Sequence, residues 1–261
     1  MDETNLSRLG QPRDTCEPIV TFIDDDGKAE ACTRLLPIFE AKNERFVVAV
    51  CPNRLNTTGY LTQSQLRELR DHGHEIVNHT FNHVGYSKVR DKAVWDEDIR
   101  RAKEFLRENG YTHDILVNPY EQGKSKKAIS IMQKHAKCAF NSMGQNKPDA
   151  FLPYRIRRIA FGSWVPGYHK YAGAPLEYYK KKVDYCFKHR TWLVWMVHSA
   201  VQPTEQDLVL AQLIDYIQSL GIEIVTASEG FAGREHLARS QSLLSMYRPK
   251  IKKYLGNLFR A

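Results

Sequence analysis

The chain has 261 residues, of which 42% are apolar, and a formal net charge of +8. This length and apolar content are sufficient for one large domain with a sizeable core. No run approaches the roughly 20 apolar residues of a transmembrane helix, and no repeat, low-complexity tract or Gly/Ser/Pro-rich linker divides the chain. These features favour a single globular domain and exclude a repeat or low-complexity protein.

Apolar runs typical of buried strands alternate with helix-like segments along the chain. The strand-like runs are IVTFI (19–23), RFVVAV (45–50), HEIVN (74–78), DILVNPY (114–120), KCAFNS (137–142), RRIAFGS (157–163), TWLVWMVHS (191–199) and GIEIVTA (221–227). Helices are expected over 29–42, 62–73, 91–108, 125–136, 175–188 and 205–220. Such alternation predicts an α/β fold with a parallel sheet, closed into a distorted (β/α) barrel of about seven to eight strands.

The segment GHEIVNHTFNH (73–83) contains a histidine pair suited to metal binding. His79 and His83 are four residues apart, so on one helical turn both imidazoles would face the same side, within reach of one zinc ion. His74-Glu75 looks like the start of a zinc-protease H-E-x-x-H motif, but the next histidine comes five residues later and on another face. The protease motif is therefore excluded. Taken alone, the pair could equally be two solvated surface histidines.

A run of three aspartates, Asp24, Asp25 and Asp26, follows the first strand and precedes Gly27. Adjacent carboxylates repel one another, so a fold that gathers them needs a cation or strong hydrogen bonds. An acidic turn exposed to water is the alternative. Combined with the histidine pair, however, one aspartate completes a three-ligand set that leaves zinc an open position for water.

Polar residues follow several of the predicted strands at the edge where barrel enzymes carry their chemistry. The aspartates end the first strand, His79 follows the third, Asn118 and Tyr120 end another, and His198 ends TWLVWMVHS. Because the carboxyl ends of parallel strands meet at one rim, we expect these side chains to gather there.

Four motifs in this order resemble the polysaccharide deacetylase (NodB-homology, carbohydrate esterase 4) superfamily: TFIDDDG, GHEIVNHTFNH, NPYEQG and WLVWMVHS. The resemblance covers roughly residues 18–228. It implies a distorted (β/α) barrel of the NodB type and a divalent metal, usually zinc, held by one Asp and two His. It also implies removal of N-acetyl groups from amino sugars.

The resemblance assigns roles to individual residues of this chain. Asp26, His79 and His83 match the metal ligands. Asp25 matches the general base that deprotonates the metal-bound water, and His198 matches the histidine that protonates the leaving amine. These roles suit amide hydrolysis, which needs a polarised carbonyl, a base for water and an acid for the amine.

Other residues are expected to bind the substrate or the oxyanion. The backbone N–H of Tyr120 would help hold the tetrahedral oxyanion, next to Asn118. Trp164 lies in the aromatic stretch SWVPGYHKYAG (163–173), which either lines a sugar cleft or packs in a folded loop.

The chain departs from the family pattern at three places. Asp24 is an additional aspartate, so the assignment of base and ligand depends on the alignment of Gly27. Asn118 stands near the place of an arginine that orients the base in the family. No tryptophan-aspartate motif supplies a partner for the acid histidine; Trp164 and Asp184 are the candidates.

We therefore expect a metal-dependent hydrolase that removes an N-acyl group, expected to be acetyl, from an amino sugar. An N-deformylase, or a catalytically weak barrel that binds carbohydrate, remains the alternative. The basic residues are spread along helix surfaces without a nucleic-acid recognition motif, so no nucleic-acid partner is expected. A positive rim would suit a nucleotide-linked or lipid-linked saccharide in glycan biosynthesis, although ordinary solvation of charge is the alternative.

The predicted domain organisation is an N-terminal extension (1–17), the barrel (18–230) and a basic C-terminal helical tail (231–261). The N-terminus lacks the apolar core of a signal peptide, and five cysteines without a C-x-x-C pair argue against a disulfide framework, so a cytoplasmic location is expected. After Pro249 the tail has the pattern of a basic amphipathic helix, which predicts weak peripheral association with anionic membranes. The alternative is that this helix packs against the barrel.

Overall fold

The computed structural model describes residues 17–148 and 151–237 and contains eight parallel strands. Each strand falls within or beside one of the predicted runs. The strands are β1 (Ile19–Asp24), β2 (Val47–Val50), β3 (Glu75–Asn78), β4 (Ile115–Val117), β5 (Cys138–Met143), β6 (Ile156–Ala160), β7 (Trp192–Val197) and β8 (Glu223–Ile224).

The sheet closes on itself. Its strand order is β2-β3-β4-β5-β6-β7-β1-β8, and an additional pairing between β1 and β2 completes a barrel of seven strands. Along one edge β1 pairs with β7 over all six of its residues. Its other edge is divided: Ile19 and Val20 pair with β8, and Ile23 and Asp24 pair with β2. The predicted NodB-type (β/α) barrel is thereby confirmed, with β8 as the additional strand.

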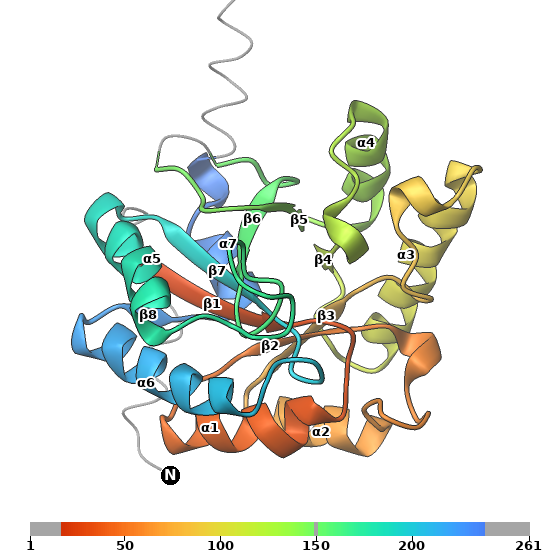
Figure 1. Cartoon of the computed structure of the whole chain (residues 1–261). Helices are drawn as coiled ribbons and strands as arrows, with labels where there is room; N and C mark the ends of the chain where they lie inside the picture. Colours follow the sequence, from red (N-terminus) through yellow and green to blue (C-terminus); the bar gives the residue numbers. More distant parts are fainter. Residues whose placement is uncertain (1–16, 149–150, 238–261) are drawn as a thin grey trace, which may run out of the picture.

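Helices surround the barrel (Figure 1). They are α1 (Leu36–Ala41), α2 (Gln63–Asp71), α3 (Lys92–Glu108), α4 (Lys126–His135), α5 (Leu176–His189), α6 (Glu205–Ser219) and α7 (Ala227–Ala232). A π-helical turn (Ala31–Leu35) leads into α1, and short 3-10 turns cover Pro52–Arg54, Tyr86–Lys88 and Pro119–Glu121. A capping box begins α2: the Thr62 side chain accepts from the Gln65 backbone N–H, and the Gln65 side chain accepts from the Thr62 backbone N–H. Helix α7 was not predicted.

Alternation along the strands separates two apolar layers. Val20 and Phe22 of β1 belong to the layer between the sheet and the helices. Ile19 and Ile23 belong to the layer that fills the barrel interior. The same alternation of inward and outward side chains decides on which side of the sheet the aspartates at the end of β1 begin.

Most of the predicted N-terminal extension and of the C-terminal tail, including the basic segment after Pro249, lies outside the described residues, so these boundaries and the membrane association stay predictions. Across residues 17–148 and 151–237, none of the helices has both the length and the apolar character needed to cross a membrane.

Candidate metal-dependent active site

The carboxyl end of β1 sends three consecutive aspartates in different directions. Asp25 is buried, Asp26 is partly exposed, and Asp24 is fully buried. The turn that separates them from the next element needs Gly27, whose φ is +66° and whose place leaves only 3.1 Å between an added Cβ and Val50 Cγ1. The close fit of this turn against β2 fixes where the aspartates point.

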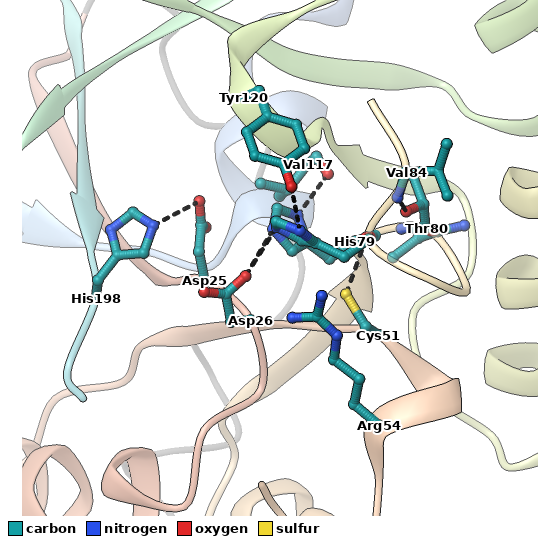
Figure 2. A network of polar contacts seen from close by, with 12 residues as sticks. Asp25, Asp26, Cys51, Arg54, His79, Thr80, Val84, Val117, Tyr120 and His198 are labelled. Atoms are coloured by element: carbon teal, nitrogen blue, oxygen red, sulfur yellow. Dashed lines mark hydrogen bonds and ion pairs between the residues drawn. The ribbon is translucent and has the colours of Figure 1, made fainter. Parts of the chain in front are cut away.

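Asp26, His79 and His83 form one compact group, and Figure 2 shows the side chains of Asp26 and His79 close together at its centre. One potential ligand atom from each lies within 4.8 Å of the others. The Nε2 atoms of His83 and His79 lie 2.9 Å and 3.5 Å from Asp26 Oδ1. The structure thus brings together the three residues that the sequence proposed as metal ligands.

The hydrogen bonds behind these residues orient their lone pairs toward a common point. The carbonyl of Val117 can only accept, so His79 donates to it from Nδ1 (2.8 Å), which leaves Nε2 of the neutral ring with a lone pair. His83 Nδ1 lies 3.1 Å from the Tyr120 hydroxyl. Asp26 Oδ1 is buried, and the Nε2 atoms of His79 and His83 face it. A carboxylate oxygen and two imidazole nitrogens that converge in this way fit a divalent metal ion.

The histidine pair does not lie on a helix, so the predicted helical turn is wrong. Residues 79–85 form a loop in which Thr80 and His83 have φ values of 62° and 61°. Asn78 Oδ1 accepts from the Thr80 N–H (2.7 Å), and Thr80 Oγ1 accepts from the Val84 N–H (2.9 Å). These bonds replace helical hydrogen bonds and bring the two rings to a centroid distance of 5.0 Å.

Arg158 holds Asp25 from across the barrel. Its guanidinium donates to both carboxylate oxygens of Asp25, at 2.7 Å and 3.0 Å, and also donates to Glu121 Oε1 at 2.6 Å and 3.1 Å. Burial alone would raise the pKa of Asp25, but Arg158, with His79 and His198, holds it below its usual range. Asp25 is therefore kept ionised and fixed in orientation.

The sequence reasoning missed Arg158 as a site residue. Strand β6 contains Arg157 and Arg158 side by side, and alternation requires one of two neighbouring strand residues to face the barrel interior. Arg157 is exposed, whereas Arg158 is 1% exposed. The adjacent pair was the signal that could have identified an inward arginine.

His198 faces Asp25 from the end of β7. Its Nε2 lies 3.9 Å from Asp25 Oδ2. The ring packs edge-on against Trp164 at a centroid distance of 4.4 Å, while its buried Nδ1 has no hydrogen-bond partner among the described residues. Asp184 accepts from Tyr216 instead. The partner of His198 is thus an indole ring rather than a carboxylate, and Asp184 as a candidate partner was wrong.

Asp24 reaches the chain immediately after His198. Its two carboxylate oxygens accept from the backbone N–H and the hydroxyl of Ser199, both at 2.8 Å. Burial raises the pKa of Asp24 well above its usual range, although the Ser199 bonds oppose this. The additional aspartate therefore connects the end of β1 to the end of β7, beside His198.

Tyr120 and Asn118 have different environments at the end of β4. Tyr120 has a φ of 61° and its side chain is 55% exposed, with the hydroxyl turned to His83. Asn118 is buried, and its Nδ2 donates to Met132 Sδ of α4 at 3.0 Å. The structure thus brings Tyr120 to the ligand group but turns the Asn118 amide toward α4.

Residues 13–138 match the family model described as polysaccharide deacetylase. The match covers just under half of the chain and shows that this segment is similar to polysaccharide deacetylases. The resemblance recognised in the four motifs is confirmed. No curated protein matches the sequence.

Solved structures resemble the fold of this chain beyond the matched segment. A mutant of peptidoglycan deacetylase PdaC from Bacillus subtilis superposes with a TM-score of 0.54 and 14% identity, over 92% of this chain and 99% of that chain. A family 4 acetyl xylan esterase from Clostridium thermocellum, in complex with a cobalt ion, superposes with a TM-score of 0.55 and 18% identity, over 82% of this chain and 90% of that chain. The chitin deacetylase of the fungal pathogen Colletotrichum lindemuthianum superposes with a TM-score of 0.53 and 16% identity, over 82% of this chain and 88% of that chain. At these identities the likeness shows the fold.

The matched segment contains only part of the candidate site. Asp25, Asp26 and both metal-facing histidines lie within residues 13–138. Arg158 and His198 lie beyond it, on β6 and β7, and reach the site because the barrel closes. The geometry of the second half therefore comes from the structure rather than from the family match.

Proposed function

We propose that this protein hydrolyses the N-acetyl amide of an amino sugar with a divalent metal ion, zinc in our expectation, held by Asp26, His79 and His83. One observation carries the proposal. The three metal-facing atoms are bordered by an ionised carboxylate, Asp25, and by a histidine, His198, whose Nε2 lies 3.9 Å from it. A metal position with a base and an acid beside it is what amide hydrolysis requires.

Each residue of this site has a distinct chemical task in the proposal. Zinc, when bound, would polarise the amide carbonyl and lower the pKa of a bound water toward 7. Asp25, kept ionised by Arg158, accepts the proton of the attacking water. His198 delivers a proton to the nitrogen, because an amine cannot leave as an anion. The indole of Trp164 packs against the His198 ring at a centroid distance of 4.4 Å and helps to hold it in place.

We propose a nucleotide-linked or lipid-linked saccharide as the substrate. The net charge of +8 favours an anionic partner. The structural neighbours are named for peptidoglycan, chitin and acetyl xylan, so the fold accommodates several saccharides. An N-formyl amide would fit the same chemistry, and the assay below distinguishes it.

The test is the release of acetate and formate from free, nucleotide-linked and lipid-linked N-acyl amino sugars by zinc-loaded protein. We expect acetate release that EDTA abolishes and zinc restores. Asp25→Asn should lose activity while keeping its metal. Formate release without acetate would assign a deformylase. Binding of the sugars without any release would overturn the hydrolase proposal in favour of a carbohydrate-binding barrel.

A further inference from the structure

Two cations that form no ion pair among the described residues, Lys28 and Arg54, follow the carboxyl ends of β1 and β2. Lys28 comes two residues after Asp26, and its Nζ lies 3.6 Å from the ring centroid of Tyr60. Arg54 follows β2, and its Nη1 donates to the Tyr60 hydroxyl at 3.1 Å. In Figure 2 the guanidinium end of Arg54 is turned toward the site. Lys28, Arg54 and Tyr60 are named the cation–tyrosine cluster below.

Apart from the bond from Arg54 to Tyr60, the side-chain N–H donors of this cluster have no hydrogen-bond acceptor among the described residues. Within residues 17–148 and 151–237, neither Lys28 nor Arg54 forms an ion pair, whereas Arg34, Arg45 and Arg158 each pair with a carboxylate. The Tyr60 oxygen accepts from Arg54, so its own hydrogen is free to donate. Two positive charges and a free hydroxyl, all half-buried, therefore surround one place.

The cluster is also fixed by the backbone beneath it. Lys28 and Tyr60 form an antiparallel bridge. The Ala29 N–H donates to the Gly59 carbonyl at 3.3 Å, and the Leu61 N–H donates to the Gly27 carbonyl at 3.0 Å. The segment that carries Lys28 and the segment that carries Tyr60 are thus joined by backbone hydrogen bonds next to the turn that presents Asp26. Such preorganisation reduces the entropy lost when a ligand binds.

We infer that the cation–tyrosine cluster binds an anionic group of the substrate, a phosphate or a carboxylate, while the acyl amide lies at the metal-facing residues. The inference rests on the proposed function and narrows its substrate to an N-acyl amino sugar with an anionic substituent close to the amide-bearing ring. Arg offers several N–H donors in a planar fork, Lys a compact charge and Tyr60 a hydroxyl, a combination suited to anionic oxygens.

The experiment compares three probes by calorimetry on zinc-loaded protein in an Asp25→Asn background, which prevents consumption of the probe. The probes are N-acetylglucosamine 1-phosphate, an N-acetylhexosaminuronic acid and uncharged methyl N-acetylglucosaminide. We expect at least one anionic probe to bind about tenfold or more tightly than the uncharged one. Arg54→Gln and Lys28→Gln should each reduce this preference, and the double variant should abolish it. The preferred probe distinguishes phosphate from carboxylate.

Lys188→Gln is the matched control, because it removes one charge at the end of α5, remote from the carboxyl ends of the strands, and should leave the preference unchanged. Far-ultraviolet circular dichroism and zinc content verify that each variant is folded and loaded. Equal binding of charged and uncharged probes, or a preference that survives the double variant, overturns the inference. Acetate release by the wild-type protein is measured separately. Acetate release without tighter binding of the anionic probes would leave the proposed function intact and overturn the inference. Tighter binding of the anionic probes without acetate release would contradict the proposed function alone.

Discussion

Arg158 neutralises the buried carboxylate of Asp25 and the partly buried carboxylate of Glu121, so its removal should affect both stability and turnover. Arg158→Met keeps much of the side-chain volume but leaves both carboxylates without their cation. Removing one partner of a buried ion pair typically costs about 3–5 kcal/mol. In a domain of this size such a loss corresponds to a decrease of ~6–20 °C in melting temperature. We also expect turnover to fall about a hundredfold or more, because the base loses its orientation and low pKa.

The dependence of this loss on pH follows from the direction of the Asp25 pKa. In the folded protein this pKa is lowered by Arg158, so the pair stabilises the fold above the unfolded aspartate pKa of about 4. That stabilisation is lost as the pH falls through the folded pKa. The difference in unfolding free energy between wild type and Arg158→Met should therefore be largest near pH 7 and should narrow below about pH 4.

Urea unfolding at fixed zinc concentration, followed by circular dichroism at several pH values, measures both effects. Arg157→Met is the matched control, because Arg157 is the exposed neighbour on the same strand and should change stability little. The reasoning is refuted if Arg158→Met unfolds within ~1 kcal/mol of Arg157→Met near pH 7, or if it retains wild-type acetate release.

Three further outcomes are expected. Asp26→Asn should lose the bound divalent ion and Asp25→Asn should keep it, as elemental analysis would show; the opposite result would shift both roles by one residue. Asp24→Leu should lower kcat with little change in KM, because it removes the hydrogen bonds to Ser199 beside His198. Asp24→Asn should restore kcat, because the amide can still form a hydrogen bond with Ser199. A leucine variant with wild-type kcat would show that the bonds between Asp24 and Ser199 are not needed. Burial lowers the pKa of His74 to about 4, so the fold favours the neutral ring and unfolding free energy should fall by up to ~3 kcal/mol as the pH drops from about 6.5 to 4. His74→Asn, which can still accept from the Phe46 N–H, should flatten this slope in urea titrations, and an unchanged slope would contradict it.

The positions of the strands, and the polar residues that follow them, were predictable from the sequence because both depend on the local pattern of apolar and polar residues. The run Trp192–Val197 is apolar throughout, and it appears as β7 with every residue buried. The strand-end pattern placed the aspartates and His79 at one rim, the family resemblance assigned Asp26, His79 and His83 as metal ligands, and the structure brings these three together. Neither inference required knowledge of which distant residues touch.

The remaining features depend on contacts that sequence spacing does not encode. Arg158 reaches Asp25 across 133 positions, and only the closed barrel makes them neighbours. The conformation of the histidine loop depends on side-chain bonds at Thr80, whose left-handed backbone no propensity favours. Asn118 stood near the expected arginine in sequence, but its amide turns to Met132.

The pairing of β1 has a consequence for the order of events during synthesis. All six residues of this first strand pair with β7, and only two pair with β2. A growing chain therefore emerges with β1 largely unpaired until Trp192 and the residues after it have been made. Closure between elements so far apart slows folding, and an apolar strand with a free edge is prone to aggregation in the meantime. Because Asp26 directly follows β1, its final position depends on one of the last strands to be synthesised, so a nascent chain that ends before β7 would contain the metal-facing residues without the barrel that holds them in place.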